Sequence, residues 1–293
     1  NAFQVDMAAS QKGSRWVFKK NPDYREAGRP YLDEVRWFVI SDQSAANAAF
    51  QTKQVDLLFD VNEPRVAEAI LRANPNAVQT KYQRTPINMY MNTQRAPLDD
   101  VRVRKAISAS MNRDTFSELF GGGEWDVGGV GAAMGVLPQE EVKRLQRFDQ
   151  AEAKRLLAEA GYPRGLDIEY VLNTGDDRNV AIFELAQAQA KEVGINLVAK
   201  AVPSTTEWSA VVRGGNFLMT GSSKLPQVDI DSDLFGVFHS KAAMNYSRVN
   251  DAKLDRLVEA QRREVNSDKR WGIIREAVRY INENVYGLTL PRL

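Results

Sequence analysis

The stretch from Pro97 to Asp114 constrains the fold of this chain more than any other. Its apolar and small residues recur at the spacing i, i+3, i+4, i+7 and i+8, which places them on one face of an α-helix. The members of this stripe are Val103, Ala106, Ile107, Ser110 and Met111. Asp99 and Asp100 precede the stripe and supply carboxylates suited to cap a helix N-terminus. We therefore predict a helix with the stripe in the core and its basic residues in water, namely Arg102, Arg104, Lys105 and Arg113.

A strand is predicted directly before this helix. The apolar residues Ile87, Met89 and Met91 alternate with the more polar Asn88, Tyr90 and Asn92. This period of two gives a strand with two unlike faces. We expect the strand to end at Asn92 and the chain to turn through a proline loop into the helix. Tyr90 and Asn92 then stand near an element end, where a side chain is free of the core.

Composition excludes several classes of function. The chain has 293 residues, of which 43% are hydrophobic and 26% charged, as in soluble globular proteins, and this length suffices for two domains. No run of about eighteen apolar residues offers a membrane span, and a formal net charge of +1 argues against nucleic acid as the main partner. The lack of cysteine excludes thiol chemistry and disulfides. With His239 as the single histidine, no metal site and no cofactor are expected.

The order of the predicted strands and helices indicates an α/β protein of two units. In the first unit, alternating residues predict strands over 3–7, 16–18 and 35–39, and 55–59 is predicted as a short buried strand. A helix capped by Ser41 or Asp42 and another beginning near Pro64 are also predicted. In the second unit, strands and helices alternate, and two long amphipathic helices over 252–264 and 268–284 close the chain. We place the units at residues 1–83 and 84–293.

A glycine-dense loop from Gly121 to Gly135 contains Trp125. A nucleotide site is not supported, because no Gly-Lys-Ser/Thr follows and Gly129-Val130-Gly131 lacks the third glycine of a dinucleotide motif. Two interpretations remain open, a plain surface loop and a loop at a ligand cleft. The second rests on Trp125, since a tryptophan in such a loop has little local core to bury it.

Three acidic residues and the single histidine are candidates for a cation site or a catalytic group. Asp229, Asp231 and Asp233 are spaced to bind a cation or to act as an acid pair. Their simpler role is to cap the segment 234–238, and no glycine and distal glutamate follow as an EF-hand requires. His239 is expected to be a partly buried, hydrogen-bonded residue. A hydrolase needs a nucleophile–base pair, and the sequence offers none, so we expect no enzymatic turnover.

Further stretches carry a recognisable wording in order along the chain. They are Lys20-Asn21-Pro22-Asp23-Tyr24 with Leu32-Asp33-Glu34-Val35, Pro97-Leu98-Asp99-Asp100-Val101-Arg102-Val103-Arg104-Lys105-Ala106 with Met111-Asn112-Arg113-Asp114, Ala158-Glu159-Ala160-Gly161-Tyr162-Pro163, Val193-Gly194-Ile195-Asn196-Leu197, and Asn245-Tyr246-Ser247 with Asp255. Together they resemble the extracytoplasmic solute-binding protein family 5, the peptide/nickel-type substrate-binding proteins of ABC importers. The resemblance extends over nearly the whole chain.

The resemblance implies a periplasmic-binding-protein-like type II α/β fold, in which two lobes close on a solute by hinge motion. Since members of the family are longer and begin with a secretion signal, we expect this chain to be incomplete at both ends. Residues 1–83 would form part of the first lobe, and residues 84–293 most of the large C-terminal lobe.

The implied function is to capture a peptide-like, oligosaccharide or other small polar solute and to deliver it to the permease subunits of an ABC importer. The implied state is a monomer, peripheral to the membrane, in the periplasm or elsewhere outside the cytoplasm, with a lipid tether as one form of attachment. The alternative is the same fold used as a ligand-sensing module for a receptor or a transcription regulator.

The resemblance also indicates a ligand site. In peptide-binding members, the segment that corresponds to residues 217–231 carries a Trp and, three residues later, an Asp that pairs with the peptide α-ammonium. Those places fall at Lys224 and Gln227. A lysine repels an ammonium, and a glutamine supplies no negative charge to balance it. Asp229 could supply that charge if the loop shifts by two residues. We therefore expect an anionic or neutral polyhydroxylated solute in preference to a peptide with a free amine. The predicted lining is Tyr90, Asn92, Trp125, Lys224, Gln227 and Asp229.

Overall fold

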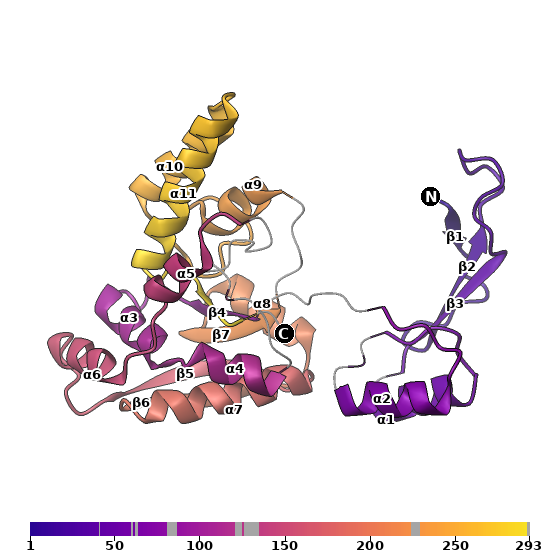
Figure 1. The fold of residues 1–293 in the computed structure, drawn as a ribbon, viewed down its shortest axis with the longest axis horizontal. Coiled ribbons are helices and arrows are strands. Elements are labelled where there is room, and N and C mark those ends of the chain that lie inside the picture. The colour runs from indigo at the N-terminus through magenta and orange to yellow at the C-terminus, as the bar shows by residue number, and fades with distance from the viewer. Residues whose placement is uncertain are drawn as a thin grey trace. The chain divides into compact units, whose positions relative to one another are not determined.

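The computed structural model describes residues 1–40, 42–59, 61, 64–80, 87–120, 125, 135–223 and 229–291. The chain divides into two compact units, Asn1–Lys81 and Tyr82–Leu293, which we call unit 1 and unit 2. Both units combine helices with a sheet, as the sequence predicts for an α/β protein (Figure 1). None of the helices in the described ranges is both long and apolar enough to cross a membrane.

Unit 1 contains a three-stranded antiparallel sheet and two helices. The sheet has the order β1 (Phe3–Val5), β2 (Arg15–Lys20) and β3 (Glu34–Phe38), and the helices are α1 (Gln43–Gln51) and α2 (Pro64–Ala73). Asp42 caps α1, since its carboxylate accepts the backbone N–H of Ala45 at 2.6 Å. The predicted hairpin, the third strand and both helices are thus confirmed.

The strand predicted over residues 55–59 is wrong, because this segment pairs with no strand of the described sheet of unit 1. Alternation of apolar residues suits a strand only where a neighbouring strand satisfies the backbone N–H and C=O groups. Here Phe59 stacks on Trp37 instead, with ring centroids 5.3 Å apart. Both rings stay more than half exposed, at 57% and 52%.

Unit 2 is built on a five-stranded mixed sheet with the order β6-β5-β7-β4-β8. The strands are β4 (Ile87–Met91), β5 (Leu166–Asn173), β6 (Ile195–Val202), β7 (Met219–Ser223) and β8 (Leu288–Thr289). β5 runs parallel to both β6 and β7, whereas β4 runs antiparallel to β7 and β8. The β4–β7 register pairs Ile87 with Ser223 and Met91 with Met219.

Helices cover both faces of this sheet. The helices are α3 (Val101–Ser110), α4 (Arg113–Phe120), α5 (Gln139–Leu145), α6 (Gln150–Glu159), α7 (Asp177–Lys191), α8 (Thr205–Gly214), α9 (Ile230–Asp233), the π-helical turn η2 (Leu234–Phe238), α10 (Ala252–Arg263) and α11 (Ser267–Glu283). α3, α6 and α7 share one apolar cluster with one face of the sheet. α8 packs in a second apolar cluster with residues on the opposite face of the sheet. α5, η2, α10 and α11 form a third apolar cluster (Figure 1).

The helix predicted from the stretch after Pro97 is confirmed as α3. Asp100 is its N-cap, and its Oδ1 accepts the backbone N–H of Arg102 at 2.8 Å. All members of the predicted stripe are fully buried, namely Val103, Ala106, Ile107, Ser110 and Met111. α3 therefore contributes a complete apolar face to the main cluster of unit 2.

Two basic residues that the sequence placed in water are instead buried. Arg113 is only 1% exposed and donates to the backbone carbonyls of Gln146 at 2.9 Å and of Thr289 at 3.1 Å. Arg104 is 3% exposed and donates to the carbonyl of Asn284 at 2.8 Å. Carbonyls at helix ends and in loops need donors, and a guanidinium can satisfy several at once. Burial lowers the pKa of Arg113 to about 9, so its guanidinium remains charged at neutral pH.

Candidate functional site

The carboxyl ends of the parallel strands in unit 2 meet at one edge of the sheet. From β5 the chain passes through α7 to β6, which lies on one side of β5, and from β6 it returns through α8 to β7 on the other side. The order of strands therefore reverses between β5 and β7. In open α/β sheets, ligands bind outside the carboxyl ends of the strands at such a reversal. We call this edge, with the loops β5–α7 and β6–α8, the carboxyl edge.

Asn173 holds the two loops of the carboxyl edge together. From the end of β5, its Oδ1 accepts the backbone N–H of Gly175 at 3.1 Å in the β5–α7 loop, and its Nδ2 donates to Thr205 Oγ1 at 3.2 Å where the β6–α8 loop enters α8. Thr174 adds a backbone bond to the Val202 carbonyl at 2.9 Å. A β-carbon on Gly175 would stand 2.9 Å from the carbonyl oxygen of Pro203, so only glycine permits this approach. These residues were not among the predicted site residues, although they lie at two strand–helix junctions that the sequence shows.

Tyr90 lies on β4 with its ring inside the molecule. It is 7% exposed and belongs to the same apolar cluster as Val171 and Trp208. Its ring meets that of the half-buried Tyr246 edge-on, with centroids 5.3 Å apart, and Tyr246 meets Trp208 in the same manner at 6.3 Å. Burial raises the pKa of Tyr90 to about 12, so its hydroxyl stays protonated. We call Tyr90, Trp208 and Tyr246 the aromatic cluster.

Asn92 follows β4 and is also buried, at 3% exposure. Its Nδ2 donates to the carbonyls of Gly215 at 3.1 Å and Phe217 at 3.2 Å, and its Oδ1 accepts the N–H of Gln94 at 3.2 Å. Because β4 and β7 are antiparallel, Asn92 lies beside the start of β7, and Ser223 lies at the other end of that strand. The structure thus separates Asn92 from the carboxyl edge.

Trp125 is buried, contrary to the expectation that its loop offers little core. It is 7% exposed and packs in the cluster of α5, α10 and α11. Its Nε1 donates to Asp114 Oδ1 at 3.1 Å, and the guanidinium carbon of Arg113 and the ammonium nitrogen of Lys143 lie 5.7 and 5.9 Å from a ring centroid. Long-range packing supplies the core that the neighbouring glycines lack. The side chain of Trp125 is therefore part of the core of unit 2.

Asp229 is exposed and caps the short helix α9, with its Oδ1 accepting the N–H of Asp231 at 2.6 Å. Asp231 in turn pairs with Arg262 at 3.3 Å. Asp229 is thus a helix cap, but it caps α9 and not the segment 234–238 that the sequence predicted. Lys224 and Gln227 lie outside the described residues.

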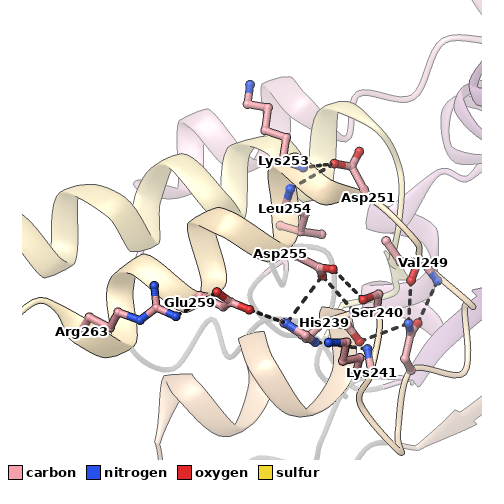
Figure 2. Close-up of polar contacts among 11 residues, drawn as sticks. His239, Ser240, Lys241, Val249, Asp251, Lys253, Leu254, Asp255, Glu259 and Arg263 are labelled. Carbon is pink, nitrogen blue, oxygen red and sulfur yellow. Dashed lines mark hydrogen bonds and ion pairs between the residues drawn. The ribbon is translucent and has the colours of Figure 1, made fainter.

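His239 is almost completely buried at the end of η2, beside α10 (Figure 2). Its Nδ1 accepts the backbone N–H of Lys241 at 3.1 Å, and its Nε2 lies 3.3 Å from Glu259 Oε1. The neighbouring Ser240 hydroxyl donates to Asp255 at 2.5 Å rather than to the imidazole. The predicted role of a hydrogen-bonded interior residue is confirmed. Over the described ranges, no three His, Asp or Glu side chains are grouped to hold a metal ion.

Comparison with known proteins was made by family, by sequence and by structure. A family model described as bacterial extracellular solute-binding proteins, family 5 Middle, matches residues 5–245. The glutathione-binding protein GsiB of Escherichia coli O1:K1 is 26% identical over 183 residues, which is 60% of this chain and 34% of GsiB. The chain therefore spans about a third of the length of the curated relatives it matches.

Two solved structures superpose on the whole chain. The binding protein MoaA from A. tumefaciens R10, in complex with mannopinic acid, has a TM-score of 0.81 and 24% identity, with 59% of its length covered. The periplasmic binding protein DppA from Helicobacter pylori, in complex with a peptide, has a TM-score of 0.85 and 21% identity, with 57% covered. At these identities the likeness shows the fold, which is the predicted periplasmic-binding-protein-like type II fold, present here in part.

Proposed function

Because this chain belongs to the bacterial extracellular solute-binding proteins of family 5, we propose that it is part of the solute-binding component of an ABC importer. The protein captures a small polar solute outside the cytoplasm, as a monomer, and presents it to the membrane permease. The family match over residues 5–245 is the observation that carries this proposal. In this proposal no bond of the solute is made or broken.

We assign the two compact units to the two lobes of such a protein. Unit 2, with its own five-stranded sheet and three apolar clusters, forms most of the large C-terminal lobe. Unit 1 forms part of the other lobe. Type II binding proteins hold their solute against walls on their lobes, which move by a hinge.

We place the wall from unit 2 at the carboxyl edge. Lys224, Gln227 and Asp229 follow β7 directly in sequence, and β7 ends at this edge beside β5. The rings of Tyr90 and Trp125 are buried in two different apolar clusters, so they belong to the interior of unit 2 and not to the wall itself. Asn92, at the far end of β4 with its amide already bonded, serves the scaffold.

The solute class follows from charge. Lys224 brings a cation and Gln227 a neutral amide to the places where a peptide-binding site needs an aromatic wall and a carboxylate. The solute is therefore an organic anion or a neutral polyhydroxylated compound, in preference to a peptide with a free amine. The complex of MoaA with mannopinic acid is a precedent for an acid as the solute on this fold. DppA in complex with a peptide and the glutathione-binding protein GsiB are precedents for the competing class of solute, which is peptides.

Calorimetry on the full-length protein, with a panel of simple peptides, oligosaccharides and organic anions, tests this proposal. We expect an organic anion or an oligosaccharide to bind and the peptides to bind weakly. For an anion, Lys224→Glu weakens binding by about tenfold or more, as loss of a charged hydrogen bond implies. The matched control is Lys105→Glu, which makes the same charge change on an exposed position of α3 and leaves affinity unchanged. Tight binding of peptides, unaffected by Lys224→Glu, contradicts the solute class and the placement of Lys224.

A further inference from the structure

The geometry around His239 fixes which imidazole nitrogen carries the proton. The backbone N–H of Lys241 donates to Nδ1, so Nδ1 holds a lone pair. Nε2 faces Glu259 Oε1 at 3.3 Å, and an ionised carboxylate only accepts hydrogen bonds. The contacts therefore assign the neutral tautomer with its proton on Nε2 (Figure 2).

Among the described residues, the charged groups near this ring lie on α10, whereas η2 contributes an aromatic ring. On the α10 side, Glu259 and Asp255 face the ring, with Asp255 Oδ1 4.0 Å from Nε2, and Arg263 pairs with Glu259 at 3.1 Å. On the η2 side, the ring stacks on Phe235 at 4.4 Å between centroids, and the guanidinium of Arg262 lies 4.1 Å from the Phe235 centroid. Two carboxylates therefore lie near Nε2, whereas the backbone N–H of Lys241 points at Nδ1.

We propose that His239 is a protonation-sensitive latch for the turn that follows it. A proton on Nδ1 would set two donors against each other, so the hydrogen bond from Lys241 breaks. The charged ring keeps its contact with Glu259 on α10, because Nε2 carries a proton and can donate in both the neutral and the charged form. The turn is closed when the imidazole is neutral and opens at Lys241 when it is charged. Imidazole changes its charge between about pH 5 and 8.

The turn connects this latch to the aromatic cluster. The carbonyl of His239 accepts the backbone N–H of Ala242 at 2.9 Å and the Nδ2 of Asn245 at 3.3 Å. Asn245 is followed by Tyr246, whose ring meets Tyr90 edge-on. Opening at Lys241 therefore removes one hydrogen bond from the turn that leads to Tyr246. This latch needs no solute, so it is independent of the proposed function.

Nuclear magnetic resonance on the full chain tests the latch directly, because His239 is the only histidine of the 293 residues. Ring nitrogen shifts report the tautomer and the titration of this one residue, provided that the sample carries no histidine tag. The second readout is hydrogen exchange of the Lys241 amide, normalised to the intrinsic rate at each pH. We expect the Nε2–H tautomer at high pH and a fall in Lys241 protection of about two- to tenfold, the equivalent of one hydrogen bond, with the midpoint of the ring titration.

Matched variants separate the latch from ordinary packing. His239→Asn offers an amide oxygen near the place of Nδ1 and cannot titrate, so Lys241 protection stays high and independent of pH. His239→Gln places its amide near Nε2 and leaves Lys241 without its acceptor, so protection is low at every pH. An Nδ1–H tautomer, a ring that does not titrate, or a Lys241 amide indifferent to the ring titration would each overturn the proposal. These three outcomes are read on the unaltered protein, so a variant that fails to fold does not remove the test.

Discussion

The hydroxyl of Tyr170 on β5 occupies the space beside Gly221 on β7 that a side chain would need. A β-carbon added to Gly221 would stand 2.2 Å from Tyr170 Oη and 3.5 Å from its Cζ. Tyr170 is 2% exposed and packs on Phe183 of α7, with ring centroids 4.7 Å apart, so it has little room to withdraw. The two residues therefore fit each other across neighbouring strands.

Gly221→Ala is expected to destabilise the protein by about 1–3 kcal/mol, the usual effect of overpacking a core. Removing the hydroxyl with Tyr170→Phe in the same chain should restore most of this loss, because the nearest ring atom then lies at an ordinary contact distance. Urea unfolding of both single variants and the double variant measures the coupling. Gly272→Ala on α11, where an added β-carbon meets nothing within 4 Å, is the control and should stabilise slightly. Additive effects at 170 and 221 would contradict the fit.

Arg113→Met is expected to cost about 3 kcal/mol or more. The guanidinium donates to carbonyls of Gln146 and Thr289, and each buried acceptor left alone costs about 1–3 kcal/mol. Thermal unfolding compares this variant with Lys105→Met, which removes a charge from an exposed position on α3, the helix before α4. Lys105→Met should change the free energy of unfolding by less than about 0.5 kcal/mol. Equal melting temperatures for the two variants would show that the buried bonds of Arg113 contribute nothing.

Ile107→Ala should cost about 2–4 kcal/mol, because this side chain is fully buried at the centre of the α3 stripe. Ile107→Asp should prevent folding, since a carboxylate there finds no water. Circular dichroism during heating distinguishes these variants from the unaltered chain. An Ile107→Asp protein that melts within about a degree of the unaltered one would contradict the packing of α3.

Glu141 on α5 and Arg279 on α11 form a two-point ion pair, with Nε–Oε1 at 2.6 Å and Nη2–Oε2 at 3.2 Å. The hydrogen bond from Arg279 holds the pKa of Glu141 below its ordinary value. The pair therefore stabilises the fold above the ordinary value of 4.5, and this stabilisation disappears as the pH falls through the lower folded value. Because Arg279 is 43% exposed, the contribution stays below about 1 kcal/mol.

Glu141→Gln should accordingly lower the melting temperature near pH 7 and have little effect near pH 3. Glu140→Gln makes the same change one residue earlier, on an exposed side chain in the same helical turn, and controls for the helix dipole. Scanning calorimetry of the three proteins at both pH values checks this prediction. A Glu141→Gln effect that persists unchanged at pH 3 would mean that the ion pair is not its source.

Features governed by near neighbours in sequence were predicted well. The caps at Asp42 and Asp100 and the stripe of α3 depend on residues within a turn or two, which the sequence displays directly. The burial of Arg113 was missed because one of its acceptors, Thr289, lies 176 positions away. A contact between residues so far apart cannot be predicted from local spacing, because the residues around Arg113 give no sign that β8 lies beside it.

The candidate site shows the same division. The role of Asp229 as a cap was within reach of the sequence, because its partner is two residues away. The burial of Trp125 depends on α10 and α11, and the hydrogen bonds of Asn92 depend on the residues just before β7. These partners are distant in the sequence, so local patterns do not predict the contacts. The register that places Ile87 beside Ser223 also separates Asn92 from the carboxyl edge, and register between strands far apart in the chain is set by packing rather than by local pattern.

The close approach of Gly175 to Pro203, with Asn173 joined to Thr205, has a consequence for how such a protein can diversify. Two loops tied at this distance cannot lengthen or shorten independently, because an insertion in one would pull apart the bonds made by the other. Change at this edge is therefore confined to exchange of side chains on a fixed backbone. A laboratory library aimed at a new solute should randomise positions along these loops and leave their lengths alone.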